Sequence, residues 1–169
     1  EQTPLNQPHA QPQMGNKRNQ NELSPLLFSI VVHRACYLQN MAQTEIGVMA
    51  HNEAGNLGHL LARLLEEPGD HRICVVSSGS TDGTDRIAMR WAEQQPRIRV
   101  ILEPTRRGKA RAINRFFSDL AASTERVVLV SGDVLPERGS LERLLAPLDQ
   151  SHVQMTGAHP CPDNPRDTW

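Results

Sequence analysis

The sequence predicts an α/β fold in which helices cover both faces of a mostly parallel β-sheet. Short apolar runs with β-branched residues alternate along the chain with segments of helical periodicity, each about 10–15 residues long. This alternation is typical of βαβ units. The runs are apolar throughout rather than alternately apolar and polar, as expected for strands that are buried on both faces.

The first part of the pattern predicts three strands and two helices. The strands are expected at 45–50 (EIGVMA), 73–76 (ICVV) and 99–102 (RVIL). The first helix ends at Pro68-Gly69, and its apolar face is formed by Leu57, Leu60, Leu61, Leu64 and Leu65. The second helix closes at Pro96 and is marked by Thr84, Ile87, Ala88 and Trp91.

The second part predicts two further strands, at 127–130 (VVLV) and 152–157 (HVQMTG). The helix before the first of them is marked by Ala110, Ile113, Phe117, Leu120 and Ala121. The helix between them is marked by Leu141, Leu144, Leu145 and Leu148. In parallel sheets of this kind ligands bind outside the carboxyl ends of the strands, so the site is expected just after residues 50, 76, 102 and 130.

The 169 residues have room for one domain, which we place at 45–160. The N-terminal extension 1–44 begins with a stretch rich in Pro, Gln and Asn, and such a composition buries too little apolar surface to become ordered. Within the extension, 26–38 (LLFSIVVHRACYL) is expected to form a short helix or strand, either as an appendage of the domain or as a membrane-surface anchor. Residues 161–169 are expected to form a tail.

Composition excludes several classes of protein. The chain has 18 basic and 19 acidic residues and a net charge of −1, whereas nucleic-acid-binding proteins usually carry a strong basic excess. Its three cysteines (Cys36, Cys74 and Cys161) are odd in number and widely spaced, so neither a disulfide framework nor a zinc knuckle is predicted. The longest apolar run is much shorter than the roughly 20 residues of a transmembrane helix, so no such segment is predicted.

Polar segments follow the first two predicted strands. AHNEAGN (50–56) places a carboxylate and two amides where a ligand would bind, although Asn52 or Glu53 would also be suited to capping the next helix. SSGSTDGT (77–84) is a hydroxyl-rich turn that leads into a helix N-terminus, where backbone N–H groups can meet an anion or the polar edges of a nucleotide. It matches neither a Walker loop nor a GxGxxG fingerprint.

Charged residues follow the next two strands. Between Arg97 and Arg115 there are seven basic residues and one acid, Glu103. Lys109 opens a helix, where the macrodipole disfavours a cation, so an anionic ligand such as a diphosphate explains the charge better than a solvated helix face does. After the fourth strand, Asp133 either caps a turn or helps to hold Mg²⁺ or Mn²⁺, which usually take one or two carboxylates plus substrate phosphates.

Taken together, four segments resemble the family 2 glycosyltransferases, which have the nucleotide-sugar-binding GT-A fold. The matching strings are IGVMAHNEAGNLGHLLARLL (46–65), ICVVSSGSTDGTDRIA (73–88), RVILEPTRRGKARAIN (99–114) and VVLVSGDVLP (127–136). The resemblance covers about 45–160 and implies a Rossmann-like three-layer sandwich that is truncated after the donor-binding half.

The resemblance implies an enzyme that transfers a sugar from a nucleoside-diphosphate donor to an acceptor hydroxyl, with inversion and with the assistance of Mg²⁺ or Mn²⁺. It also implies residues at the nucleoside, the base, the diphosphate and the metal. Ala50, Asn52 and Glu53 would lie at the nucleoside, and Ser78 would lie at the base, with Gly79 and Ser80 in the same turn. Lys109 would lie at the diphosphate and Asp133 at the metal. The implied location is the cytoplasm or the cytoplasmic face of a membrane, with peripheral membrane association of the full-length protein. The acceptor is not implied.

Two motifs depart from the family pattern. The family usually has Asp-Asp-Gly-Ser at 77–80 and Asp-x-Asp at 131–133, where this chain has serine in place of the first aspartate of each motif, and also at Ser78. The change at Ser131 predicts weak or altered metal use. The family's general base is a carboxylate of the acceptor half, and Asp163 and Asp167 match no family motif, so we expect the base to lie outside this chain. Two alternatives stay open: a non-catalytic nucleotide-binding or interaction domain of the same fold, and another α/β enzyme such as a nucleotidyltransferase.

Overall fold

A computed structural model describes residues 43–159 and Cys161. They belong to the second of the two units into which the chain divides, Ala42–Trp169. Residues 1–42 and 162–169 lie outside the described residues, and with them lie most of the predicted extension, its apolar segment 26–38 and most of the predicted tail. None of the described helices is both long enough and apolar enough to cross a membrane.

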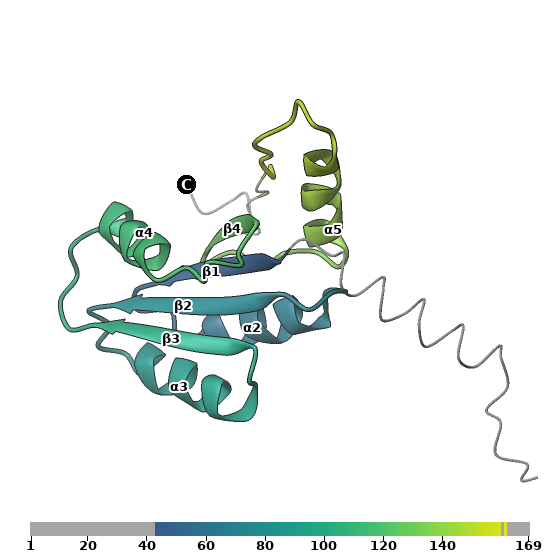
Figure 1. Cartoon of the computed structure of the whole chain (residues 1–169). Helices are drawn as coiled ribbons and strands as arrows, with labels where there is room; N and C mark the ends of the chain where they lie inside the picture. Colours follow the sequence, from purple (N-terminus) through teal and green to yellow (C-terminus); the bar gives the residue numbers. More distant parts are fainter. Residues whose placement is uncertain (1–42, 160, 162–169) are drawn as a thin grey trace, which may run out of the picture. The chain divides into compact units, whose positions relative to one another are not determined.

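The sheet has four parallel strands in the order β3-β2-β1-β4 (Figure 1). They are β1 (Thr44–Ala50), β2 (Arg72–Ser78), β3 (Ile98–Glu103) and β4 (Arg126–Ser131). Thr44, which the sequence assigned to the N-terminal extension, is the first residue of β1. Each strand contains one of the predicted apolar runs, and Val48 in the centre of β1 is opposite Val75 on one side and Val130 on the other.

Helices lie on both faces of the sheet, giving three layers. Figure 1 shows α2 (Leu57–Glu66) and α3 (Thr84–Gln94) beneath one face and α4 (Lys109–Ser118) on the other. The chain then continues through a short helix, α5 (Ser140–Leu145), and the 3₁₀ helix η1 (Ala146–Asp149). This arrangement confirms the predicted α/β fold with a parallel sheet.

The main core lies between the sheet and the helices α2, α3 and α5. Four of the five predicted leucines of α2 are fully or almost fully buried there, and Leu65 packs against them from a partly buried position. Leu141 and Leu145 of α5 join the same cluster. Burying apolar side chains of this size stabilises a fold by about 1.5–3 kcal/mol each, so this layer holds the helices firmly against the sheet.

The face of α4 that meets the sheet matches the predicted one only in part. Ile113 and, just after the helix, Leu120 pack against the core on this side of the sheet from partly buried positions, as predicted. Ala112 and Phe116 are buried, whereas Phe117, which the periodicity placed on the apolar face, is 47% exposed. Phe116 lies over Gly47 of β1, where a Cβ atom would stand 2.8 Å from the aromatic ring. Gly47 therefore leaves the space that the Phe116 ring occupies, and Phe116 rather than Phe117 is the buried phenylalanine.

The predicted fifth strand at 152–157 is wrong. These residues form no strand, and Met155 is 87% exposed. The segment is instead attached to α5, because the Thr156 hydroxyl donates a hydrogen bond to the carbonyl oxygen of Leu144 at 2.8 Å. The described sheet therefore ends at β4, where Leu129 is 45% exposed.

A buried ion pair joins the sheet to the loop after α4. The Glu45 carboxylate is almost fully buried and accepts hydrogen bonds from Arg99 at 2.5 and 2.9 Å and from the Thr124 hydroxyl at 3.1 Å. Arg99 also pairs with the carboxylate of Asp119 and donates to its backbone carbonyl. This network lies away from the carboxyl ends of the strands, where the candidate site is expected.

Candidate functional site

The sheet order creates a topological switch point between β1 and β4. After β1 the chain builds the sheet outward through β2 and β3, then crosses over by α4 and adds β4 to the opposite side of β1. At such a point the connections leave neighbouring strands in opposite directions, which opens a crevice outside their carboxyl ends. The polar segments that follow β1 and β4 meet there.

A cleft of about 200 Å³ occupies this position. Its walls come from the ends of β1, β2 and β4 and from the loop that leads into α4. The lining residues are Met49, Ala50, His51, Glu53, Ser78, Arg106, Gly108, Lys109, Ala112, Ser131 and Asp133. The cleft thus gathers residues from all four polar segments that the sequence singled out.

Five of the eight predicted site residues line the cleft: Ala50, Glu53, Ser78, Lys109 and Asp133. The other three, Asn52, Gly79 and Ser80, lie in the adjoining loops and are not part of its lining.

Asn52 and Ser80 make contacts between the loops that follow β1 and β2. The backbone N–H of Asn52 donates to the Ser80 hydroxyl at 3.2 Å, and the side-chain oxygen of Asn52 accepts from the backbone N–H of Thr81 at 2.8 Å.

Gly79 has a conformational and a steric role. Its φ is +60°, and a Cβ atom at this position would stand 2.3 Å from the backbone nitrogen of Arg106. The loop before α4 therefore passes directly over Gly79. Only glycine allows this approach, which brings Arg106 to the cleft.

His51 and Arg106 are lining residues that the sequence did not single out individually. The His51 Nδ1 atom lies 2.7 Å from the carbonyl oxygen of Ser78. A carbonyl oxygen only accepts, so Nδ1 carries a proton and donates this hydrogen bond. Both residues lie within segments that the sequence singled out. The sequence does not distinguish His51 from its neighbour Asn52, or Arg106 from the other basic residues of its segment, as a residue that lines a cleft.

The Ser78 hydroxyl is buried in the wall of the cleft without a hydrogen-bond partner among the described residues. Leaving a buried hydroxyl unpaired costs free energy, so such groups are usually satisfied by a ligand or by water. A hydroxyl both donates and accepts, and Ser78 can therefore bind either kind of polar group.

Positive charge is concentrated on one wall of the cleft. Lys109 is the first residue of α4, and Arg106 lies in the loop before it. Neither cationic group has a described carboxylate within 4.0 Å. All ion pairs among the described residues involve other side chains. Two cations beside a helix N-terminus, without an ion-pair partner among the described residues, form a suitable environment for an anionic ligand.

Asp133 is the carboxylate at the end of β4. A hydrogen bond from the Ser131 side chain lowers the pKa of Asp133, and the nearby charge of Lys109 lowers it further. The group is therefore ionised at neutral pH and is available to a cation. The described residues contain no group of three or more His, Cys, Asp or Glu side chains that could by themselves hold a metal.

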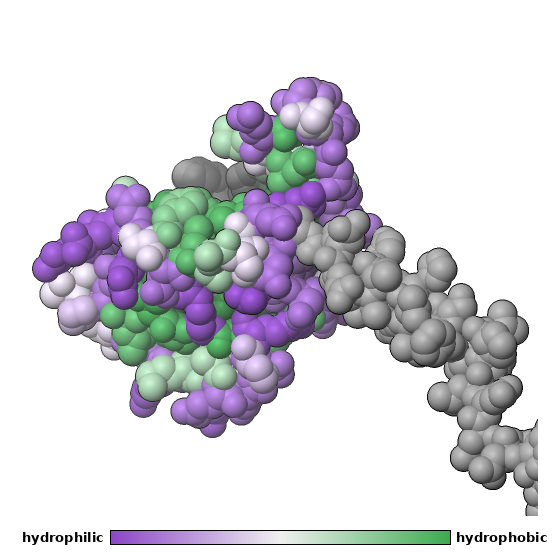
Figure 2. Space-filling view, viewed as in Figure 1, coloured by the Kyte–Doolittle hydropathy of each residue, from purple (hydrophilic) through white to green (hydrophobic). Residues whose placement is uncertain are grey.

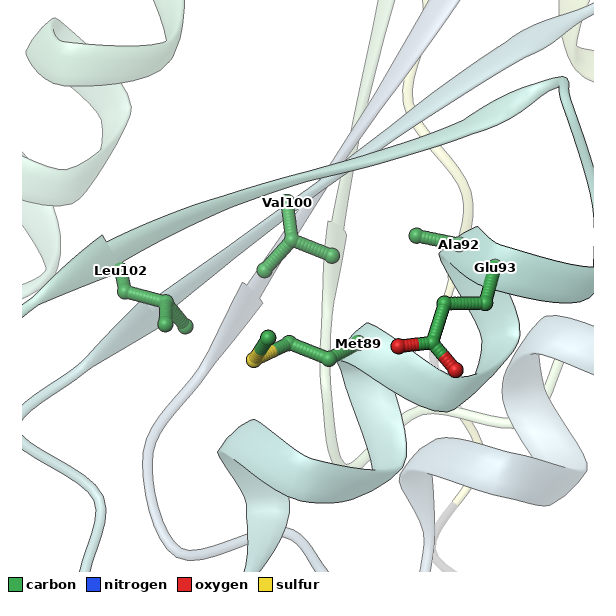
Figure 3. A pocket seen from close by; sticks show the side chains of 5 residues that line it. All are labelled: Met89, Ala92, Glu93, Val100 and Leu102. Atoms are coloured by element: carbon green, nitrogen blue, oxygen red, sulfur yellow. The ribbon is translucent and has the colours of Figure 1, made fainter.

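A larger hollow of about 410 Å³ lies elsewhere, between α3 and the outer strand β3 (Figure 3). In Figure 3 Met89, Ala92 and Glu93 of the helix face Val100 and Leu102 of the strand. Figure 2 shows apolar surface along this edge of the sheet. Glu93 is the only titratable side chain in its lining, so this hollow offers less chemistry than the cleft at the switch point.

Residues 45–168 match the model of Glycosyl transferase family 2. The chain is 32% identical over 81 residues to the succinoglycan biosynthesis protein ExoA of Rhizobium meliloti, covering 47% of this chain and 24% of that protein. It is 34% identical over 106 residues to an uncharacterized glycosyltransferase of Mycobacterium tuberculosis, covering 63% and 44%.

Solved structures share the fold. A mannosyltransferase from Pyrobaculum calidifontis, determined in complex with GDP-Man and Mn²⁺, superposes with a TM-score of 0.61 at 30% identity, over 76% of this chain and 41% of that one. Glucosyl-3-phosphoglycerate synthase from Mycobacterium tuberculosis, determined with UDP, superposes with a TM-score of 0.54 at 22% identity, over 69% and 43%. The chain therefore spans less than half the length of each of these relatives.

Proposed function

The chain belongs to glycosyl transferase family 2, and from this premise we propose that residues 45–160 form the donor-binding part of a sugar-transferring enzyme. The proposed reaction moves a sugar from a nucleoside-diphosphate donor to an acceptor hydroxyl, with inversion at the anomeric carbon and with assistance from Mg²⁺ or Mn²⁺. The observation that carries this proposal is the cleft at the β1–β4 switch point. It combines an ionised carboxylate with two cations and a buried hydroxyl that have no ion-pair or hydrogen-bond partner in the part of the chain that the structure describes.

The two cationic side chains are suited to the diphosphate. Lys109 and Arg106 face the cleft from the start of α4, and in the proposed reaction they bind the phosphates and stabilise the negative charge that develops on the leaving group. Charge-assisted hydrogen bonds of this kind contribute about 1.5–3 kcal/mol each. The helix dipole of α4 acts in the same direction.

The wall of the cleft at the ends of β1 and β2 is suited to the nucleoside. Ala50, His51, Glu53 and Ser78 line it from the ends of β1 and β2. Glu53 supplies an acceptor, and the unsatisfied Ser78 hydroxyl supplies a group that donates or accepts. We propose that Asn52, Gly79 and Ser80 support this wall. Asn52 joins the loops after β1 and β2 through its contacts with Ser80 and Thr81, and Gly79 lets the loop before α4 approach.

The residues at the end of β4 fit a divalent metal that the substrate helps to hold. Asp133 provides one carboxylate oxygen donor beside the Ser131 hydroxyl, and Mg²⁺ commonly binds through one or two carboxylates together with substrate phosphates. When bound, the metal would neutralise charge on the departing diphosphate. Asp133 would hold it, and Lys109 would hold the phosphates from the other side. We assign no general base among the described residues.

Calorimetric titration tests this proposal. UDP, GDP and CDP are titrated into the chain with and without Mn²⁺, and we expect one diphosphate to bind more tightly with the metal. Lys109→Ala should weaken binding about tenfold or more, since a lost charged contact is worth that much. Asp133→Asn should remove the effect of the metal.

Two exposed residues away from the cleft provide matched controls. Arg90→Ala removes a cation from α3, and Asp149→Asn removes a carboxylate that pairs with Arg126. Both should bind like the unchanged protein. If the two site variants behave like these controls, the proposed donor site is incorrect.

A second candidate function is nucleotide binding without transfer. The observation that favours it is the lack of a carboxylate cluster among the described residues, with serine at position 131 in place of the family's usual aspartate. Sugar transfer by a longer protein that includes the sequence after residue 169 would exclude it. Location at the cytoplasmic face of a membrane remains a prediction of the family resemblance.

A further inference from the structure

Three consecutive backbone N–H groups in the loop after β1 donate to side chains of the segment that leads from β2 into α3. Asn52 donates to the Ser80 hydroxyl at 3.2 Å, Glu53 to the Thr84 hydroxyl at 2.8 Å and Ala54 to the Asp82 carboxylate at 2.9 Å. We call these three hydrogen bonds, from Asn52, Glu53 and Ala54 to Ser80, Thr84 and Asp82, the loop clamp. The partners are 28–31 residues apart in the sequence.

Each hydroxyl in the loop clamp has one proton, and this fixes the direction of its hydrogen bonds. The Thr84 hydroxyl donates to Asp82 at 2.5 Å, so its lone pair is free to accept from the Glu53 N–H. The Ala54 N–H reaches the other oxygen of Asp82 directly. Two neighbouring backbone groups of the β1 loop therefore both end on the carboxylate of Asp82.

The first N–H group reaches a different carboxylate. The Ser77 hydroxyl donates to Asp85 at 2.6 Å, so it can accept the proton of the Ser80 hydroxyl, which lies 2.8 Å away. The Ser80 oxygen then accepts from the Asn52 N–H. A chain of two serine hydroxyls thus connects the β1 loop to Asp85.

The β1 loop is held in a conformation that it would not adopt readily without support. Asn52 has a φ of +57°, in the left-handed region that non-glycine residues seldom occupy, although asparagine tolerates it better than most. Its side-chain oxygen also accepts the N–H of Thr81 at 2.8 Å, so the contacts run in both directions between the loops. A strained residue persists when its surroundings over-determine its conformation.

The segment held in this way carries one wall of the cleft. Glu53 and the adjacent His51 line the cleft, whereas Asp82 and Asp85 do not. We propose that Asp82 is a positioning residue for donor binding: acting through Thr84 and Ala54, it fixes the backbone that carries the Glu53 side chain before the nucleotide arrives. This inference rests on the proposed function and adds to it a residue that does not touch the donor.

The ionisation of Asp82 agrees with this role. Hydrogen bonds from the Thr84 side chain and from the Ala54 N–H lower the pKa of Asp82, although its carboxylate is exposed to solvent. The charged form is therefore the one that the loop clamp prefers, and a neutral amide is a poor substitute. Ala54 and Thr84 donate to different oxygens of Asp82, and in asparagine one of these two positions is an NH₂ group that can only donate, so one of the two hydrogen bonds is lost.

The test compares four variants of the full chain. Asp82→Asn removes the charge, and Thr84→Val removes the bridging hydroxyl from a fully buried side chain while keeping its shape. Thr84→Ser restores the hydroxyl, and Asp149→Asn is the control for an exposed carboxylate elsewhere. Amide hydrogen exchange of Glu53 and Ala54 is measured in the free proteins, and UDP, GDP and CDP are titrated with Mn²⁺.

We expect Asp82→Asn and Thr84→Val to accelerate exchange at Glu53 and Ala54 and to weaken binding of the preferred diphosphate about tenfold. Thr84→Ser and Asp149→Asn should stay within about twofold of the unchanged protein. Binding that is unaffected by Asp82→Asn and Thr84→Val overturns the positioning role, even if exchange accelerates. If the unchanged protein binds no diphosphate, the proposed function fails and the positioning role fails with it. The exchange data then still report whether the loop clamp exists.

Discussion

Gly132, the first residue after β4, lies directly against the side chain of Glu53 in the loop after β1. A Cβ atom added to Gly132 would stand 2.9 Å from Cγ of Glu53 and 3.2 Å from the carbonyl oxygen of Met49. That carbonyl accepts a hydrogen bond from the Gly132 N–H at 2.8 Å. The segments that follow β1 and β4 therefore pack closely at the switch point because position 132 has no side chain.

The first prediction follows from this contact. Gly132→Ala should lower the free energy of unfolding by about 1–3 kcal/mol, because backbone as well as side-chain atoms stand in the way of the new methyl group. It should also weaken nucleotide diphosphate binding, because Glu53 has to move. Urea denaturation and calorimetry measure the two effects. Gly55→Ala is the control, since nothing lies within 4 Å of its added Cβ atom.

The second prediction concerns acid. Hydrogen bonds lower the pKa of Asp82 and of Asp133 in the folded chain, so between the folded and unfolded pKa values the unfolded chain binds more protons. The stability that these groups contribute is therefore complete above about pH 5 and is lost as the pH falls below about 4. Urea denaturation from pH 7 to pH 3 should show a difference between the unchanged protein and Asp82→Asn that is constant above pH 5 and shrinks below pH 4. A difference that grows toward pH 3 would contradict this assignment.

The third prediction explains a departure from the family pattern. Ser77 stands where the family usually has aspartate, and it is fully buried with its hydroxyl 2.6 Å from the Asp85 carboxylate. Ser77→Asp should therefore place two carboxylates together, raise the pKa of one of them and destabilise the fold by roughly 1–3 kcal/mol. The double variant Ser77→Asp/Asp85→Ser should recover most of the loss in thermal denaturation. Equal stability of the single and double variants would show that the two positions are not coupled.

The fourth prediction concerns the Glu45–Arg99 pair. Arg99→Met leaves the buried Glu45 carboxylate without its cation and should cost about 3–5 kcal/mol of stability. Glu45→Gln/Arg99→Met should cost less, because no buried charge is left uncompensated. Urea denaturation compares the two variants. Neither should change nucleotide binding under conditions where the protein is folded, since the pair does not line the cleft.

Much of the fold could be predicted because its signals are local. The leucine spacing of α2 and the four apolar runs reflect local periodicity, and the structure forms a helix or strand at each of them. The expected burial on both faces is not met in the outer strands, where Leu102 and Leu129 are exposed. The choice between Phe116 and Phe117 is not local. It depends on the space above Gly47 in a strand that is far away in the sequence. The run at 152–157 has the composition of a strand, but its described residues pair with no other strand.

The candidate site divides in the same way. The rule that ligands bind at the carboxyl ends of parallel strands indicated the segments of Glu53, Lys109 and Asp133, and the family resemblance implied these three as site residues. The structure brings them together in the cleft. The sequence could not show that Asn52 bonds to another loop, because its partners Ser80 and Thr81 come nearly 30 residues later. A polar side chain after a strand looks the same in a sequence whether it faces a ligand or a neighbouring loop.

The strand order also affects the order in which the parts of the sheet form during folding. Ile46 pairs with Ile73, which is 27 residues away, and with Val128, which is 82 residues away. Closing the longer loop costs about 1 kcal/mol more in chain entropy, so the β1–β2–β3 portion is expected to form before β4 docks. The loop clamp joins elements of the early portion, whereas Asp133 arrives with the last strand. During folding, the wall that we assign to the nucleoside should therefore be complete before the end assigned to the metal exists.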